Sequence, residues 1–318
     1  MTDFERRLEE LRRTAAETGH VDGHGVHAIG SPMPARRDGV LAEYYGQPLL
    51  KRPVWTWEVP AYFFVGGAAG AASVIGAIAN MMGGRPDLVR DARWVAAAGA
   101  AMSPPLLIAD LGRPERFLNM MRVFKLQSPM SVGVWTLLAF SNAAGAAAVA
   151  EFIDRKSGGR IPVRVIGNAA EVMSAATGLV LSTYTGVLIG ATTIPVWSHN
   201  VRLLPIHFGA SGVGTAVSVL ELMGHRDNAL NALGIGAAAV ETAIGFSLEL
   251  REDPALDPLK HGWSGTVTRM GGVLSGPVPL ALRVLGARSV HARRAAAVST
   301  IVGSLLTRMG WLAAGRGE

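Results

Sequence analysis

Eight apolar windows, each about 20 residues long, dominate this chain of 318 residues. That length is what a helix needs to cross the hydrocarbon core of a bilayer. Only helices and closed barrels satisfy every backbone polar group inside lipid, so the windows predict an all-α integral membrane protein with eight transmembrane helices. The predicted spans cover residues 58–82, 92–111, 131–152, 165–190, 203–223, 229–248, 266–284 and 296–314.

Composition agrees with a multi-pass membrane protein that uses the lipid bilayer as its solvent. Hydrophobic residues make up 49% of the chain and charged residues only 17%, a balance that excludes a large soluble domain. Residues 1–52 are polar and predict an extramembrane N-terminal tail, whereas residues 53–318 form the predicted membrane domain. The GxxxG pairs Gly66–Gly70 and Gly186–Gly190 are typical of closely packed helices, although such pairs also arise by chance in a chain with 39 glycines.

The residue types present exclude a resident metal redox centre. The chain has no cysteine, so it cannot hold an iron–sulfur cluster or a cysteine-ligated zinc through its own thiolates. A membrane haem usually needs two facing histidines, and only His207 lies clearly within a span. His20, His24 and His27 have a metal-like spacing, but their Gly-rich setting favours a flexible segment. We therefore predict no haem and no metal site.

Basic residues serve as topology signals rather than as a nucleic-acid surface, because they lie in tails and short loops. An even number of spans places both termini on one side of the membrane. The opposite side would carry twelve basic residues: Arg85, Arg90, Arg93, Arg155, Lys156, Arg160, Arg164, Arg226, Arg283, Arg288, Arg293 and Arg294. The loops on the terminal side would carry eight: Arg113, Arg116, Arg122, Lys125, Arg202, Arg251, Lys260 and Arg269. The positive-inside rule then favours termini outside the cytoplasm, although the tail, with eight more basic residues, opposes this assignment.

Four polar side chains fall at one depth, near the face that holds the termini: Glu58, Asp110, Tyr184 and His207. Ionisable groups in hydrocarbon are costly and usually mark a functional site. A quinone needs hydrogen-bond partners for two ring oxygens and a group that exchanges protons, and these side chains supply both. Simpler roles remain open: Glu58 at the lipid interface, Asp110 as a helix cap or paired with Arg113, and Tyr184 in an aromatic belt.

Three further carboxylates within the predicted spans are candidates for proton transfer. Glu171 and Glu221 lie towards the inner face, and Glu241 lies in the outer half of the sixth span. They could form a proton-transfer route to the other face of the membrane, or structural pairs inside a helix bundle.

Three segments carry a resemblance to a known family. They are WEVPAYFFVGGAAG at 57–70, DLGRPERFLNMMRVFKLQSPMS at 110–131 and YTGVLIGATTIPVW at 184–197. They resemble the signature stretches of the NrfD/PsrC family, the quinone-interacting membrane subunits of polysulfide reductase, nitrite reductase and related complexes. The resemblance extends from about Tyr44 to the eighth span and leaves the tail unexplained.

The resemblance implies two four-helix bundles in a bacterial cytoplasmic membrane. A subunit of this kind passes electrons between a membrane quinone, menaquinone or ubiquinone, and a docked ferredoxin-like iron–sulfur subunit. A large catalytic subunit, such as a molybdopterin enzyme, would complete the complex.

The resemblance also assigns roles to residues. The family's first-helix quinone ligand falls on Glu58 and its fourth-helix tyrosine on Tyr184. A first-helix histidine of some members aligns with Ala61, and this departure shifts its task to Asp110 or His207.

The partner-docking residues come from the same resemblance. Tyr45, in the YYGQP stretch, lies in the segment that abuts the quinone pocket in the family. Arg113 and Arg116 follow the second span and are predicted to dock the partner, with bilayer-surface anchoring as the alternative.

Two other functions remain open at this point. A secondary transporter would show an inverted repeat and helices broken near the midplane, and no clear repeat relates the two halves. A passive anchor would hold the complex at the membrane without contacting quinone.

Overall fold

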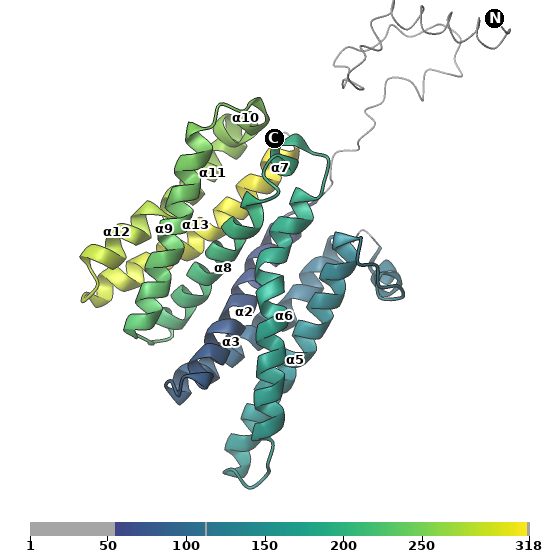
Figure 1. Cartoon of the computed structure of the whole chain (residues 1–318), viewed down its shortest axis with the longest axis vertical. Helices are drawn as coiled ribbons and strands as arrows, with labels where there is room; N and C mark the ends of the chain where they lie inside the picture. Colours follow the sequence, from purple (N-terminus) through teal and green to yellow (C-terminus); the bar gives the residue numbers. More distant parts are fainter. Residues whose placement is uncertain (1–54, 112, 317–318) are drawn as a thin grey trace, which may run out of the picture. The chain divides into compact units, whose positions relative to one another are not determined.

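The computed structural model describes residues 55–111 and 113–316, and within them every regular element is a helix (Figure 1). The long helices are α2 (Glu58–Met81), α3 (Pro86–Ala109), α5 (Pro129–Ser157), α6 (Arg164–Gly190), α8 (Leu203–Leu222), α9 (Asn228–Leu250), α11 (Gly262–Ser275), α12 (Pro277–Leu285) and α13 (Val290–Arg316). Short helices connect them: η1 (Pro114–Arg116), α4 (Phe117–Met120), α7 (Pro195–Ser198), η2 (Pro254–Leu256) and α10 (Asp257–Lys260). The predicted tail and Tyr45 lie outside the described residues.

Six of the described helices are long and apolar enough to cross a membrane, namely α2, α5, α6, α8, α9 and α13. The protein is therefore a multi-pass integral membrane protein. The second and seventh predicted spans do not meet the same standard of length and composition. α3 starts with a charged stretch that includes Arg90, Asp91 and Arg93, and this lowers its hydropathy.

The seventh predicted span, 266–284, is two helices rather than one. Gly276 separates α11 from α12 with φ −103° and ψ −98°, far from helical values. Pro277 follows and has no N–H to donate back into α11. The break therefore has a local cause in the Gly-Pro pair.

Helix ends follow the local sequence. The Ser128 hydroxyl accepts a hydrogen bond from the Ser131 N–H and caps α5, whose first residue is Pro129. This placement suits proline, because the first turn of a helix has no carbonyl for its N–H. α5 ends at Gly158, which has the left-handed φ of 61° that stops a helix without strain.

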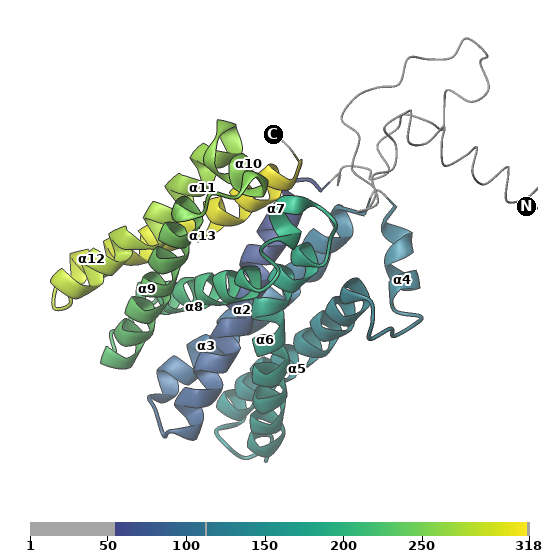
Figure 2. The same ribbon diagram turned by 45° about the horizontal axis from the view of Figure 1, so that its top comes forward.

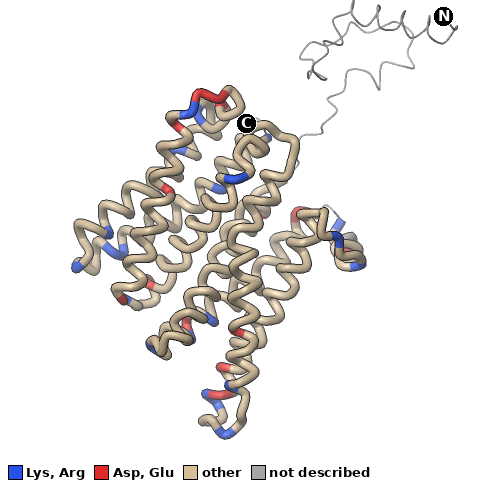
Figure 3. Tube along the Cα trace, viewed as in Figure 1, with Lys and Arg blue, Asp and Glu red and all other residues tan. Residues whose placement is uncertain are grey.

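The helices pack in two contact groups. α2 contacts α3 and α6, and α5 contacts α3 and α6, so these four helices close a ring. In the second group, α8 and α13 contact each other, while α9, α11 and α12 complete the set. Contacts of α8 with α2 and α6, and of α13 with α2, join the groups (Figures 1 and 2). Charged residues gather mainly at the helix ends, with a few isolated ones along the helices (Figure 3).

Glycines allow the closest helix approaches. A Cβ added to Gly70 on α2 would lie 2.3 Å from the carbonyl oxygen of Gly178 on α6. A Cβ on Gly186 would lie 2.5 Å from the backbone of Leu204 on α8. Small residues thus bring α6 against both α2 and α8, which is the usual basis of helix association in lipid.

We predict that Gly178→Ala destabilises the protein by about 1–3 kcal/mol, the usual range for an overpacked interior. The new methyl group would meet the Ser73 hydroxyl at 2.3 Å and the Gly70 carbonyl at 2.8 Å. Thermal unfolding in detergent measures the effect. Gly145→Ala on α5 is the control, because nothing lies within 4 Å of its added Cβ. Equal melting temperatures for the two variants would contradict the close crossing.

Candidate functional site

Glu58 and Asp110 meet at Thr56. Glu58 is the first residue of α2 and Asp110 follows the last residue of α3. The Thr56 N–H and its hydroxyl both contact Asp110 Oδ1 at 3.1 Å, and the same hydroxyl contacts Glu58 Oε2. Among the described residues Asp110 therefore pairs with Thr56 and forms no ion pair with Arg113.

This arrangement links two carboxyl groups through one hydroxyl. A hydroxyl carries one hydrogen, so Thr56 can donate to only one carboxylate at a time. The other contact is favourable when that carboxyl group is itself protonated. The two carboxyl groups and Thr56 form a hydrogen-bonded cluster, the Thr56 cluster, at the ends of α2 and α3, and both carboxyl-bearing residues are only partly buried.

Tyr184 on α6 is buried, with 6% of its surface exposed. Its hydroxyl donates to the Pro129 carbonyl at 2.5 Å. Gly133 makes room for the ring, since a Cβ there would lie 2.0 Å from Tyr184 Cζ. Tyr62, one turn after Glu58 on α2, is also buried. Tyr184 is therefore an interior residue and does not belong to an aromatic belt.

His207 belongs to a different cluster. Its Nε2 lies 3.1 Å from Glu241 Oε2, and the Ser275 hydroxyl donates to the same oxygen at 2.8 Å. These side chains join α8, α9 and the end of α11. The structure thus brings Glu58 and Asp110 together and places His207 with Glu241.

Aromatic side chains connect the start of α2 with His207. Trp55 stacks on Trp197 with ring centroids 5.4 Å apart, and the Trp197 indole N–H donates to the Trp311 carbonyl at 2.8 Å. The Trp311 ring lies 6.1 Å from the His207 ring. Gly315 leaves space for Trp197, because a Cβ there would fall 1.9 Å from the indole. This packing fixes the end of the molecule that carries the Thr56 cluster.

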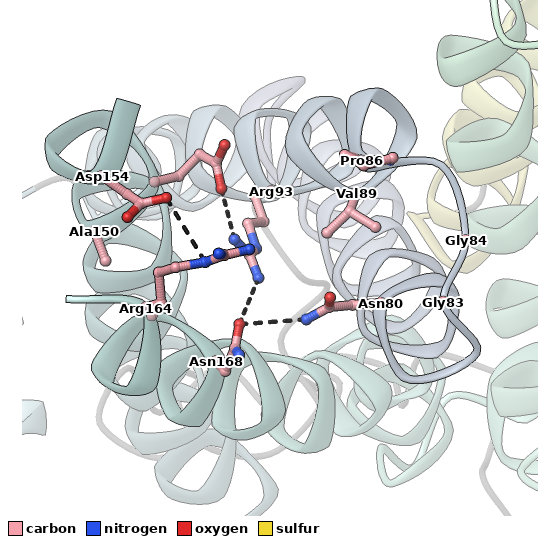
Figure 4. A pocket seen from close by; sticks show the side chains of 12 residues that line it. Asn80, Gly83, Gly84, Pro86, Val89, Arg93, Ala150, Asp154, Arg164 and Asn168 are labelled. Atoms are coloured by element: carbon pink, nitrogen blue, oxygen red, sulfur yellow. Dashed lines mark hydrogen bonds and ion pairs between the residues drawn. The ribbon is translucent and has the colours of Figure 1, made fainter. Parts of the chain in front are cut away.

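Glu171 is held by an arginine. Arg93 donates to Glu171 through Nε at 3.0 Å and Nη2 at 2.8 Å, and through Nη1 to Glu151 at 2.7 Å. Asn80 donates to Glu171 at 2.6 Å. Arg93 also lines a cavity of about 320 Å³ at this end of α2, α3, α5 and α6, with Asn168 beside it (Figure 4).

Glu221 is clamped between two buried arginines. Arg283 Nη1 donates to Oε1 at 3.0 Å, and Arg293 donates to the same oxygen from Nε at 3.1 Å and from Nη2 at 2.5 Å. Arg283 Nη2 also lies 2.9 Å from Oε2, without hydrogen-bond geometry. Arg93, Arg283 and Arg293 are thus ion-pair partners rather than loop charges.

The connection between α3 and α5 carries the predicted docking residues. Arg113 is exposed and Arg116 lies in η1. Large apolar side chains are also exposed here: Leu118, Val123, Phe124 and Leu126. Apolar and basic groups therefore share a surface next to Asp110.

Comparison with known proteins decides the family. A family model described as "Polysulphide reductase, NrfD" matches residues 48–231, more than half of the chain. This chain belongs to the NrfD family. The match contains the Thr56 cluster, Tyr184 and His207, and it ends at the start of α9.

One curated relative is the C subunit of the polysulfide reductase of Wolinella succinogenes. The two sequences are 27% identical over 190 residues, which is 54% of this protein and 58% of the relative. The match therefore spans little more than half the length of that relative.

Besides Thr56, two side chains of this NrfD protein escaped the sequence analysis. Arg308 on α13 is fully buried and donates only to neutral oxygens: the hydroxyls of Ser211 and Ser304 at 2.6 Å each, and backbone carbonyls. Its position inside the eighth predicted span was a usable signal, because a cation at membrane depth is rarely incidental. The other is Tyr62, whose four-residue spacing from Glu58 places both on one helix face.

Among the described residues, no group of three or more His, Cys, Asp or Glu side chains could hold a metal ion. The ionisable groups in the helices instead pair with one another and with hydroxyl or amide groups. The candidate site is therefore a set of hydrogen-bonding side chains.

We predict that Glu221→Gln costs about 3–5 kcal/mol of stability, because it leaves two buried guanidinium groups without their carboxylate. The exposed pair of Glu249 with Arg269 provides the control, and Glu249→Gln should cost at most about 1 kcal/mol. Denaturant unfolding in detergent measures both. Similar losses for the two variants would show that the buried cluster does not stabilise this end of the protein.

Proposed function

We propose that this NrfD-family protein is the membrane subunit of a respiratory oxidoreductase complex in a bacterial cytoplasmic membrane. It would exchange electrons and protons between a membrane quinone, menaquinone or ubiquinone, and a docked ferredoxin-like iron–sulfur subunit. A large catalytic subunit, such as a molybdopterin enzyme, would complete the complex. The two helix contact groups would be two four-helix bundles, with α3 and the α11–α12 pair as the remaining crossings of eight and both termini outside.

The observation that carries the proposal is the Thr56 cluster. A quinone supplies two-electron, two-proton chemistry when it binds, and the protein must offer hydrogen bonds to its oxygens and a place for its protons. Glu58 and Asp110 lie at helix ends, are partly exposed and share one hydroxyl. A proton can be held there without an unpaired charge.

The tyrosines support the same site. The Tyr184 hydroxyl donates to a backbone carbonyl that has no competing side-chain donor among the hydrogen bonds described, and Tyr62 is buried one turn after Glu58 on α2. A hydroxyl that rotates away from Pro129 could donate to a ring oxygen instead. The proposed quinone-binding residues are therefore Glu58, Asp110 and Tyr184, with Tyr62 as an addition from the structure.

The docking surface is proposed next to this cluster. Arg113 follows Asp110 closely in the chain, and the exposed apolar side chains of the α3–α5 connection continue beyond Arg116. Exposed apolar groups with basic neighbours are typical of protein interfaces. A partner bound there would bring its cluster near the quinone head.

The three carboxylates proposed for proton transfer differ in their surroundings. Glu171 and Glu221 hold arginines at ion-pair distance, which supports a structural role for both. Glu241 contacts His207 and Ser275 and, among the residues that the structure describes, has no arginine at that distance. Glu241 is therefore the best of the three for exchanging a proton.

The transporter alternative gains one supporting observation, the helix break at Gly276. Transporters of that type have discontinuous helices in corresponding positions of both halves. In the first contact group, α2, α3, α5 and α6 are each continuous. The passive-anchor alternative is distinguished by the experiment below.

We predict that Glu58→Gln and Tyr184→Phe each lower quinone-linked turnover of the whole complex about tenfold or more. Losing a hydrogen bond to a charged or buried group has this size of effect. Turnover with a soluble artificial dye, which takes electrons directly from the catalytic partners, should stay unchanged. Glu252→Gln is the control, since Glu252 is an exposed carboxylate in the connection after α9.

Unchanged quinone-linked turnover in both variants would end the assignment of this site and favour the passive anchor. An equal fall in both assays would show instead that the variants disturb assembly of the complex.

A further inference from the structure

A second cavity lies in the other contact group, between α9 and α11. Its volume is about 290 Å³, and most of its lining is apolar, with Phe246, Leu248, Leu259 and Val273 among the residues. Glu241 also lines it. The cavity lies beyond residue 231, outside the region matched by the family model.

Glu241 has hydrogen-bonding capacity that the protein leaves unused. Only 2% of its surface is exposed, and Oε2 receives the contacts of His207 and Ser275. Oε1 is buried and has no hydrogen-bond partner in the described part of the chain. An unpartnered carboxylate oxygen in an apolar setting is costly, and a ligand that donates a hydrogen bond there would remove this cost.

The helix break at Gly276 lies at the end of the cavity that holds Glu241. Pro277 is a lining residue, and Ser275 donates to Glu241 from the end of α11. A Cβ on Gly276 would come within 3.0 Å of the backbone nitrogen of Thr242, so this position requires glycine. Non-helical backbone at membrane depth is tolerated where it is buried or lines a cavity.

Two residues that line the cavity are exposed on the surface of the protein. Phe246 and Val273 line it and are 64% and 50% exposed. Met270, on the same helix as Val273, is also exposed. In a membrane protein such side chains contact lipid, so a ligand would enter from the bilayer rather than from water.

Charged side chains border the other end of the cavity. Arg269 and Glu249 form an ion pair with Nε to Oε1 at 2.6 Å, and Lys260 donates to the backbone carbonyls of Glu249 and Arg251. These charges are already matched by oxygens of the protein. They give little reason to expect a charged lipid headgroup, which leaves the hydrogen-bond acceptor at Glu241 as the specific feature.

We infer that this cavity is a second quinol site, in which a ring hydroxyl donates to Glu241 Oε1 and the ring lies against the apolar walls. The ligand class rests on the proposed function, while the site itself rests on the cavity and on Glu241. It is built from α9, α11 and α12, whereas the Thr56 cluster lies on α2 and α3. His207, predicted from the sequence to bind quinone, would act here by holding Glu241 in position.

The test is the number of quinol molecules bound to the purified complex in nanodiscs. The probe is a radiolabelled quinol with a decyl tail, kept reduced under anaerobic conditions. Wild type should bind two per protein. Val273→Trp, which fills the cavity from its lipid-facing side, should bind one, and Met270→Trp, on the same helix outside the cavity lining, should still bind two.

Two more variants separate this inference from the proposed function. Glu241→Gln should weaken one of the two sites about tenfold, because a charged acceptor is lost. Glu58→Gln should affect only the other site. If the Thr56 cluster binds no quinol, wild type binds one molecule and Val273→Trp removes it.

The inference is overturned if Val273→Trp binds as many quinols as wild type. It is also overturned if wild type binds a single quinol and Glu58→Gln abolishes that binding. A phospholipid chain in the cavity, in place of a quinol, would be one form of this result.

Discussion

The pairing of buried charges across helices is the constraint on which the rest of this structure depends. Lipid offers no water to an ion, so every charged group at membrane depth needs a protein partner. Arg93 joins α3 to α5 and α6, and Glu221 joins α8 to arginines on α12 and α13. These pairs set the rotation of the helices about their axes, which apolar packing between Ala- and Gly-rich surfaces would leave poorly determined.

The same constraint separates two kinds of polar cluster. At the end of the molecule with Arg93 and Glu221, carboxylates form ion pairs with arginines. At the other end, Glu58 and Asp110 share a threonine, and Glu241 faces a histidine. Groups that are paired with hydroxyls and imidazole can gain or lose a proton without leaving a strong ion unpartnered, which is why the proposed chemistry is assigned to them.

Much of the fold could be predicted from the sequence, because window length and apolar content determine where a membrane helix lies. The predicted span 203–223 corresponds to α8 and the span 165–190 to α6, each within a residue at either end. The break at Gly276 was not predicted, since averaging over a window hides a single Gly-Pro pair. Six helices meet the standard for a membrane span, and the eight crossings remain a proposal.

The candidate site was harder to predict, because position in a span gives depth but not direction. Depth alone grouped His207 with Glu58, whereas rotation and packing place His207 against Glu241 on α9. Thr56 and Tyr62 were missed because neither is charged, and the search for polar groups in the spans concentrated on ionisable residues. Glu58 and Asp110 could be predicted to lie close together, because each lies at the end of a helix and both ends lie at the same depth.

Photoaffinity labelling of the wild-type complex in its native membrane tests the central claim most directly. An azido-quinone that is photolysed during turnover should attach to the peptide 55–62 or to the end of α3 near Asp110, and labelling of the α9–α11 cavity would be compatible with this result. Labelling confined to α9–α13, or to the partner subunits alone, would contradict a quinone site built on Glu58, Thr56 and Asp110.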